Sequence, residues 1–184
     1  VMSDLKNSDI NILYWGQGGL GLGDRDYYMN DDAQTLKIRE AYKQFIVKLL
    51  MLSGYKKADA ERMRDNVMGI EMELAKVAMT RTEQRDYMAQ YNIRTLAEVE
   101  KLCPNIDWKQ YLTAQYLPIV DSMCVMQLKS LEKVNELIAN KSMREIKDHL
   151  IFHLVNSASD YLGDNFRKVN FEMSSTISGA EQDR

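Results

Sequence analysis

The chain has 184 residues and a mass of 21.3 kDa, which suits one globular domain or two small ones. Its hydrophobic fraction of 45% and charged fraction of 28% are ordinary for folded proteins and argue against wholesale disorder. The net charge of -3 disfavours a basic domain built around nucleic acid, and no apolar run approaches the ~18 residues that a membrane-spanning helix needs.

A β-prone run at residues 11–15 leads into a glycine-rich stretch at residues 16–23, which we expect to form a loop because glycine loses backbone entropy in regular elements. Residues 16–21 match the G-x-G-x-x-G pattern of dinucleotide sites. Such sites need a helix that opens at the motif within alternating strands and helices. Here the charged and aromatic residues 24–28 intervene, and we expect them at the surface. A structural loop is therefore favoured over a nucleotide site.

Helical periodicity begins near Ala33, after an acidic pair, Asp31 and Asp32, that is suited to cap the helix. Gly54 is placed to end this first helix. A second helix is expected over residues 58–79, and the short connection predicts an antiparallel helical hairpin. The apolar residues that define the two helices are Ile38, Tyr42, Phe45, Leu49 and Leu52, then Met63, Val67, Ile70, Leu74 and Val77.

Further helices are predicted in the second half of the chain. Residues 80–92 are polar and expected to be irregular, and the charged run 81–86 is interpreted as surface. Capping-box patterns at Thr95/Glu98 and Ser142/Glu145 predict two helix starts. Asp107 predicts another, for a helix that ends near Pro118, and a further helix is expected over residues 128–139. The last helix should run to about residue 161 or 166 on the apolar line Ile146, Leu150, Leu154, Ala158 and Tyr161.

These elements predict an all-α fold, an array of antiparallel helices with a short β-prone segment at the N-terminus. We expect a single helical domain over residues 1–184. With 9 Gly and 2 Pro, the composition argues against a turn-rich all-β fold. The two cysteines, Cys103 and Cys124, exclude a disulfide-rich scaffold, and two free thiols are favoured over a pair.

The two histidines, His149 and His153, lie at i and i+4 on one helix face, the spacing that helical zinc peptidases use to direct two imidazoles at one metal. The glutamate of H-E-x-x-H is replaced by Leu150, Asp148 lies on another side of the helix, and no third ligand is apparent. Partly buried histidines beside the core are therefore favoured over a small metalloenzyme. Glu71 and Glu73, near Arg62 and Lys76, are interpreted as a solvated face.

Several stretches resemble the neprilysin and endothelin-converting-enzyme family of zinc metalloendopeptidases, in the same order and over essentially the whole chain. Residues 20–28, Leu-Gly-Leu-Gly-Asp-Arg-Asp-Tyr-Tyr, match the family's G-L-G-L-P-D-R-D-Y-Y stretch, with Gly23 where the family usually has proline. The other stretches are residues 70–75, Arg85 with residues 91–96, residues 106–112, and residues 165–168 followed by residues 178–179. The resemblance implies a bacterial member, because the paired cysteines of the animal ectoenzymes are mostly absent.

The resemblance implies two mainly helical lobes around a central cavity, with zinc bound in one lobe by H-E-x-x-H and a downstream glutamate. Neither that motif nor the family's N-A-Y-Y-like stretch occurs here, so the chain is expected to be part of the other, capping lobe. We therefore predict no catalytic, cofactor-binding or metal-ligating residue in this segment, and no activity of the segment alone. Zinc would belong to the parent enzyme. The expected partners are the catalytic lobe of the same polypeptide and small peptide substrates.

The sequence leaves alternatives for the compartment and for the function. The compartment is not settled: the resemblance favours the periplasm or cell envelope for the parent, with the cytoplasm as the alternative. The polar C-terminal run, residues 178–184, and the internal position of Met2 suggest a segment of a longer chain. The alternative function is a stand-alone helical peptide- or protein-binding module that uses the tyrosine-rich surface around Tyr27 and Tyr28.

Overall fold

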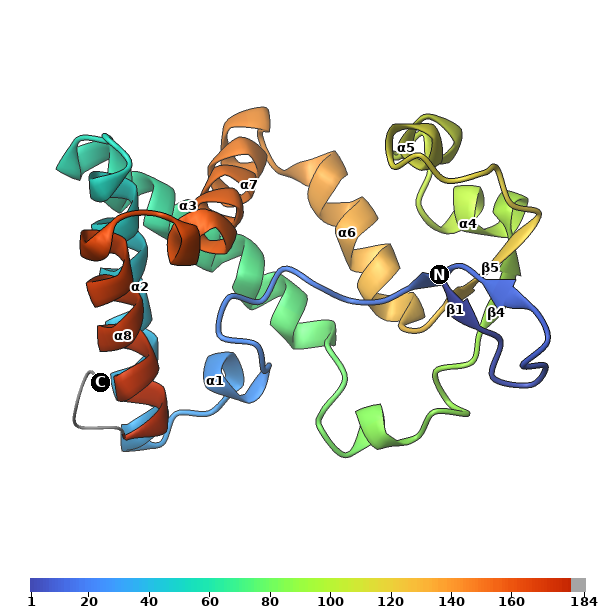
Figure 1. Cartoon of the computed structure of the whole chain (residues 1–184), viewed down its shortest axis with the longest axis horizontal. Coiled ribbons are helices and arrows are strands. Elements are labelled where there is room, and N and C mark those ends of the chain that lie inside the picture. Colours follow the sequence, from blue (N-terminus) through green and yellow to red (C-terminus); the bar gives the residue numbers. More distant parts are fainter. Residues whose placement is uncertain (180–184) are drawn as a thin grey trace. The chain divides into compact units, whose positions relative to one another are not determined.

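The computed structural model describes residues 1–179, and helices dominate it, as the sequence predicts (Figure 1). Residues 180–184, the end of the polar C-terminal run, lie outside the described residues. The chain forms two compact units: unit 1 comprises residues 1–18 and 77–140, and unit 2 comprises residues 19–76 and 141 onward. The single domain expected over residues 1–184 stays a prediction.

Unit 1 combines short strands with small helices. A two-stranded antiparallel pair joins β1 (Met2–Ser3) to β2 (Asn11–Ile12), and β5 (Ser122–Val125) lies between β3 (Tyr14–Trp15), which is parallel to it, and β4 (Ile93–Thr95), which is antiparallel. The helices are η1 (Glu83–Arg85), α4 (Leu96–Leu102), α5 (Trp108–Ala114) and α6 (Leu128–Asn140). The β-prone N-terminal segment is therefore confirmed, whereas β4 and β5 are additions that the sequence did not predict.

The core of unit 1 forms where α4, α5 and α6 meet this small sheet. Its buried residues are Val99, Cys103, Trp108, Met123, Val125 and Leu131. Thr95 and Glu98 form the predicted capping box, and the Asp107 side chain accepts from the backbone N–H of Gln110 at the start of α5. Helix α5 ends at Ala114, four residues before Pro118, so the predicted end was too late. The charged run 81–86 is exposed, as predicted.

Unit 2 contains almost all of α3 (Lys57–Val77) together with α1 (Asp26–Met29), α2 (Ala33–Leu52), α7 (Met143–Ala158), η2 (Ser159–Tyr161) and α8 (Asp164–Ser178). The Asp32 side chain accepts from the N–H groups of Gln34 and Thr35, so it caps α2 as predicted. Gly54 ends the same helix with a positive φ of 95°, and Tyr55 N–H bonds back to the carbonyl of Leu50, a Schellman motif.

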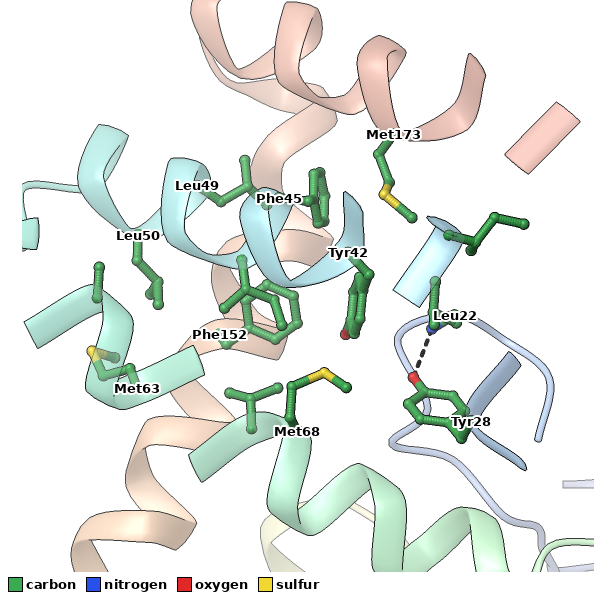
Figure 2. Packing of buried hydrophobic residues seen from close by; sticks show 14 of the residues in the cluster. Leu22, Tyr28, Tyr42, Phe45, Leu49, Leu50, Met63, Met68, Phe152 and Met173 are labelled. Carbon is green, nitrogen blue, oxygen red and sulfur yellow. Dashed lines mark hydrogen bonds between the residues drawn. The ribbon is translucent and has the colours of Figure 1, made fainter. Parts of the chain in front are cut away.

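Helix α8 lies alongside α2 and makes the most extensive backbone contact in the unit (Figure 1). The antiparallel hairpin expected of α2 and α3 is therefore replaced by a pairing of α2 with a later helix. Helices α2 and α3 still share one core with α7, shown in Figure 2. Phe152 of α7 packs edge-on against Tyr42 and Phe45 of α2, with ring centroids 6.0 and 6.4 Å apart.

The burial of α7 differs from the prediction. Its buried residues are Asp148 and Phe152, and Ile151 and Val155 pack against the same core. Leu150 and Leu154, which the apolar line assigned to the core, are 60% and 71% exposed, and Tyr161 is also exposed. Helix α7 is rotated about its axis so that the ring of Phe152 faces the core of unit 2. Leu150 and Leu154 therefore face outward. The predicted helix also ends early, at Ala158, and α8 follows as a separate helix.

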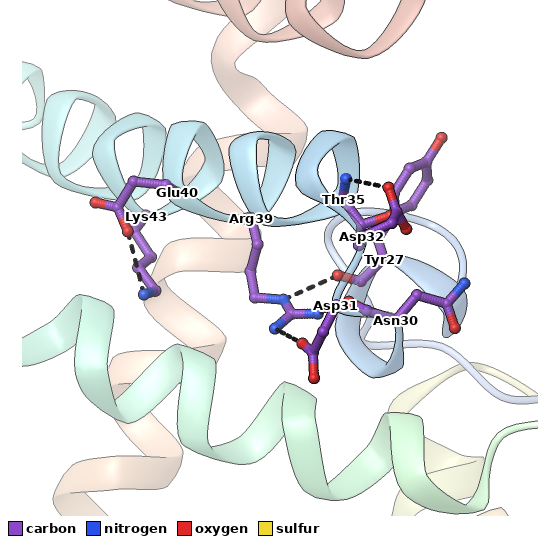
Figure 3. A network of polar contacts seen from close by, with 8 residues as sticks. All are labelled: Tyr27, Asn30, Asp31, Asp32, Thr35, Arg39, Glu40 and Lys43. Atoms are coloured by element: carbon purple, nitrogen blue, oxygen red, sulfur yellow. Dashed lines mark hydrogen bonds and ion pairs between the residues drawn. The ribbon is translucent and has the colours of Figure 1, made fainter.

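Arg39 fixes the connection between α1 and α2 (Figure 3). Its guanidinium donates to the backbone carbonyls of Tyr27, at 3.0 Å, and Asn30, at 2.5 Å. It also forms an ion pair with Asp31 at 3.2 Å. Because these bonds satisfy the last carbonyls of a four-residue helix, they hold the segment that carries Tyr27 and Tyr28 against α2.

Candidate functional site

The centre of the candidate site is the carboxylate of Glu71, which is fully buried (0% exposed) on α3. Tyr28 donates a 2.6 Å hydrogen bond to its Oε2 atom, and Tyr42 donates a 2.9 Å bond to Oε1. Nε2 of His153 lies 2.9 Å from the same Oε1. Helices α1, α2 and α7 therefore each supply one polar side chain to a single carboxylate of α3.

The burial of Glu71 overturns the prediction that Glu71 and Glu73 form a solvated face. Glu73 is partly exposed and pairs with Lys76 on the surface, as predicted. Glu71 instead lies four residues after Val67 and three before Leu74, both of which are buried. That spacing places Glu71 inside the apolar stripe of the helix, and it is the signal in the sequence that could have identified it.

Tyr28 is also buried, at 1% exposure, so the prediction of a tyrosine-rich surface around Tyr27 and Tyr28 is wrong for this residue. Its hydroxyl accepts a 3.0 Å hydrogen bond from the backbone N–H of Leu22 (Figure 2). The same hydroxyl donates to Glu71. Burial, and then the nearby Glu71 charge, raise the pKa of Tyr28 well above its ordinary value. The phenol therefore stays protonated and donating, and it offers little surface to a partner.

The glycine-rich stretch passes close to this cluster. A Cβ atom at Gly21 would lie 1.8 Å from the hydroxyl oxygen of Tyr42, so no larger residue fits without displacing that ring. Gly19 has a positive φ of 82°, and a Cβ there would lie 3.2 Å from Cδ1 of Leu74 and 3.6 Å from Cε1 of His149. These glycines permit close packing of the chain.

The dinucleotide interpretation lacks its structural context. Residues 16–21 form a loop, as predicted, and the next helix, α1, starts only at Asp26 and has four residues. A phosphate site of that class requires a helix whose N-terminus opens at the motif. The structure therefore favours the loop interpretation.

His149 lies one turn before His153 on α7, with ring centroids 4.4 Å apart and planes inclined by 54°. Its Nε2 atom is buried and forms no hydrogen bond with the described residues. Burial, and then the proximity of His153, lower the pKa of His149 to about 4. One ring nitrogen of each histidine and a carboxylate oxygen of Glu71 lie within 4.8 Å of one another. Glu71 thus lies next to the histidine pair as a possible third ligand, which was not apparent from the sequence.

A second polar contact orients α7 on α3. Asp148, which is buried, forms an ion pair with Arg62, and Asn66 donates a 2.7 Å hydrogen bond to the same carboxylate oxygen. Asp148 therefore faces a different group from the two histidines, as the sequence predicts. Because Arg62 and Asn66 belong to α3, the contact fixes the rotation of α7 that directs His149 and His153 toward Glu71.

The cysteines offer no reactive site. Cys103 and Cys124 are both buried free thiols, so the prediction of unpaired cysteines is confirmed. Burial raises the pKa of Cys103 to about 11 and raises that of Cys124 as well. Both side chains are therefore thiols at neutral pH, and a thiol is a poor nucleophile compared with the thiolate.

Comparison with known proteins relates this geometry to a family. The sequence model of peptidase family M13 matches residues 1–184. Endothelin-converting enzyme 1 of Cavia porcellus is 28% identical over 187 residues, covering 99% of this chain and 25% of that protein. A neutral endopeptidase of Lactobacillus helveticus is 29% identical over 182 residues, covering 99% and 28%. The chain therefore spans about a quarter of the length of the relatives it matches.

Solved structures agree with this relationship. The Mycobacterium tuberculosis zinc metalloprotease Zmp1, in complex with an inhibitor, superposes with a TM-score of 0.83 at 25% identity, covering 93% of this chain and 26% of that one. PepO from Lactobacillus rhamnosis superposes with a TM-score of 0.85 at 17% identity, covering 97% and 28%, which supports the shared fold.

None of the helices among the described residues is long and apolar enough to cross a membrane.

Proposed function

Because the chain belongs to peptidase family M13, we propose that it is part of the helical, non-catalytic lobe of a zinc metalloendopeptidase that cleaves oligopeptides. The observation that carries the proposal is the family match over residues 1–184 in a chain that covers 24–28% of its relatives. The sequence contains no H-E-x-x-H. On this proposal the ligands of the catalytic zinc lie outside residues 1–184, and no residue of this chain takes part in the hydrolysis at that zinc.

The role we propose for the lobe is to close the central cavity and to restrict substrates to small peptides. A zinc-bound water supplies the nucleophile in metallopeptidases, and a closed cavity limits the access of bulk water and folded proteins to it. Stiffness is the property that this task requires. In unit 2 it is supported by the packing of Phe152 against Tyr42 and Phe45, and by the hydrogen bonds that join three helices to Glu71.

The exposed face of α7 supports a partner within the same polypeptide. Met143, Leu150 and Leu154 are spaced by seven and four residues, which places them on one side of the helix, and all three are exposed. Exposed apolar side chains that gather on one face favour burial against another protein surface. We propose that the remainder of the polypeptide, including its catalytic lobe, covers this stripe.

The test separates the activity of this chain from that of its parent. The 184-residue chain and the full-length polypeptide that contains it are each incubated with a fluorogenic peptide, with and without a chelator. We expect hydrolysis by the full-length polypeptide alone, abolished by chelation and restored by zinc. Hydrolysis by the 184-residue chain that is lost in a His153→Gln variant would instead support the small metalloenzyme and contradict the proposal.

A further inference from the structure

The carboxylate of Glu71 is fully buried (0% exposed). Its hydrogen-bond partners are two phenols and the imidazole of His153. No lysine or arginine among the described residues forms an ion pair with it. A buried carboxylate is costly unless it is paired or coordinates a cation. The site therefore has the charge and the donor atoms to receive a positive ion.

We propose that Glu71, His149 and His153 form a binding site for a divalent transition-metal cation of the zinc class. Imidazole nitrogen and carboxylate oxygen are the ligands that such ions accept, and two histidines with one carboxylate leave a fourth position for water. The three groups come from two helices, with the histidines one turn apart on α7 and the glutamate on α3. This differs from the sequence-based prediction that the segment contains no metal ligand.

The geometry requires only side-chain adjustment. Zinc bonds of about 2.0–2.2 Å in a tetrahedral arrangement set the ligand atoms roughly 3.3 Å apart. The three ligand atoms lie within 4.8 Å of one another, so the widest separation must close by about 1.5 Å. His153 is already close to Glu71, and bound metal would replace the hydrogen bond between them. The His153 side chain is 25% exposed, so one of the three ligands reaches the protein surface.

The surroundings also suit a metal ligand set. Metal-bound carboxylates are oriented by hydrogen bonds from neighbouring residues, and Tyr28 and Tyr42 already donate to the two oxygens of Glu71. The Arg62–Asp148 ion pair and Asn66 fix α7 one residue before His149. These contacts position both histidines without occupying them.

The experiment measures zinc binding by the purified 184-residue chain, stripped of metal with a chelator and then dialysed. Elemental analysis checks that the dialysed protein is free of metal, and isothermal titration with zinc then gives the affinity and the stoichiometry. We expect one zinc per chain. Affinity should fall about tenfold or more in His153→Gln and in Glu71→Gln, and should be retained in Leu150→Gln, an exposed neighbour on α7. Far-UV circular dichroism checks the helical content of each variant.

Two results would overturn the proposal. One is the absence of saturable zinc binding to the unmodified chain. The other is equal affinity in the unmodified chain and in folded His153→Gln and Glu71→Gln variants. Where a variant loses its helical content, the unmodified chain decides: zinc must raise its thermal unfolding midpoint, and an unchanged midpoint contradicts the site.

Discussion

The hydroxyl of Tyr28 donates a 2.6 Å hydrogen bond to Oε2 of Glu71, 43 residues further along the chain, and both side chains are buried. The bond joins the short helix that follows the glycine-rich stretch to the middle of α3. Since Tyr28 also accepts from the N–H of Leu22, one phenol ties the loop to the core. This relationship makes the stretch that carries the family resemblance a structural part of unit 2.

Tyr28→Phe should lower the free energy of unfolding by about 1.5–3 kcal/mol, because a hydrogen bond to a buried charged group is lost. Tyr27→Phe is the matched control, since the Tyr27 hydroxyl forms no hydrogen bond among the described residues, and it should change stability by less than about 0.5 kcal/mol. Urea denaturation measures both. Combining Tyr28→Phe with Glu71→Gln should give less than the sum of the single effects; strict additivity would mean that the two residues are not coupled.

Gly21→Ala should destabilise the chain by about 1–3 kcal/mol, because the new Cβ would lie 1.8 Å from the Tyr42 hydroxyl. Gly18→Ala is the control, since a Cβ at Gly18 meets nothing within 4 Å. Thermal unfolding followed by circular dichroism compares the two variants. Equal stability of Gly21→Ala and Gly18→Ala would show that the stretch does not pack against Tyr42 in solution.

Phe152→Ala should cost about 3–5 kcal/mol, because it removes a fully buried ring from contact with Tyr42 and Phe45. Leu154→Ala on the same helix removes an exposed side chain and should change stability by less than about 0.5 kcal/mol. Urea denaturation measures both free energies of unfolding. If Leu154 lay in the core, as the sequence predicted, Leu154→Ala would also be strongly destabilising, and that result would contradict the observed burial of α7.

The capping box of α7 should give a pH-dependent stability. A hydrogen bond from Lys141, and then those from Ser142, lower the pKa of Glu145 from 4.5 to about 2. A carboxyl whose folded pKa is depressed stabilises the fold above its unfolded pKa, and that stability is lost as pH falls from about 4.5 toward 2. Glu145→Gln should therefore be less stable than the unmodified chain at pH 7, with the difference shrinking between pH 4.5 and 3. Glu132→Gln, an exposed glutamate on α6, controls for charge removal, and a pH-independent difference would contradict the prediction.

The two cysteines should resist modification in the folded chain. Cys103 and Cys124 are buried, and burial raises the pKa of Cys103 to about 11. Reaction with a disulfide reagent at pH 8 should be slow in buffer and rapid in denaturant, where both thiols react. Rapid reaction of the folded chain would mean that unit 1 opens readily or is packed differently.

Local patterns predicted much of the fold. Asp32, the Thr95/Glu98 and Ser142/Glu145 boxes, and Gly54 mark helix boundaries through interactions within a few residues, so the sequence alone reveals them. Helix α8 and strands β4 and β5 were not predicted. Strand β5 is short and pairs with segments far away in sequence, so its stability depends on contacts that local periodicity does not record.

The candidate site also depends on contacts between residues far apart in the sequence, which local patterns do not reveal. The pairing of His149 with His153 follows from helical spacing and was predicted. The burial of Glu71 depends on three partners from different helices, Tyr28, Tyr42 and His153, so a charged residue on a helix was interpreted as solvated. Leu150 and Leu154 show the reverse: apolar residues assigned to the core lie outside, where we propose that further chain covers them.

The most direct measurement of the proposed role is the dependence of cleavage on substrate size by the full-length polypeptide. One cleavable sequence is presented as a short peptide and within a loop of a folded protein, and kcat/KM is measured for each. If the lobe excludes folded proteins, the peptide should be cleaved efficiently and the folded protein not at all, and Phe152→Ala should reduce this discrimination. Equal kcat/KM for the two substrates would contradict it.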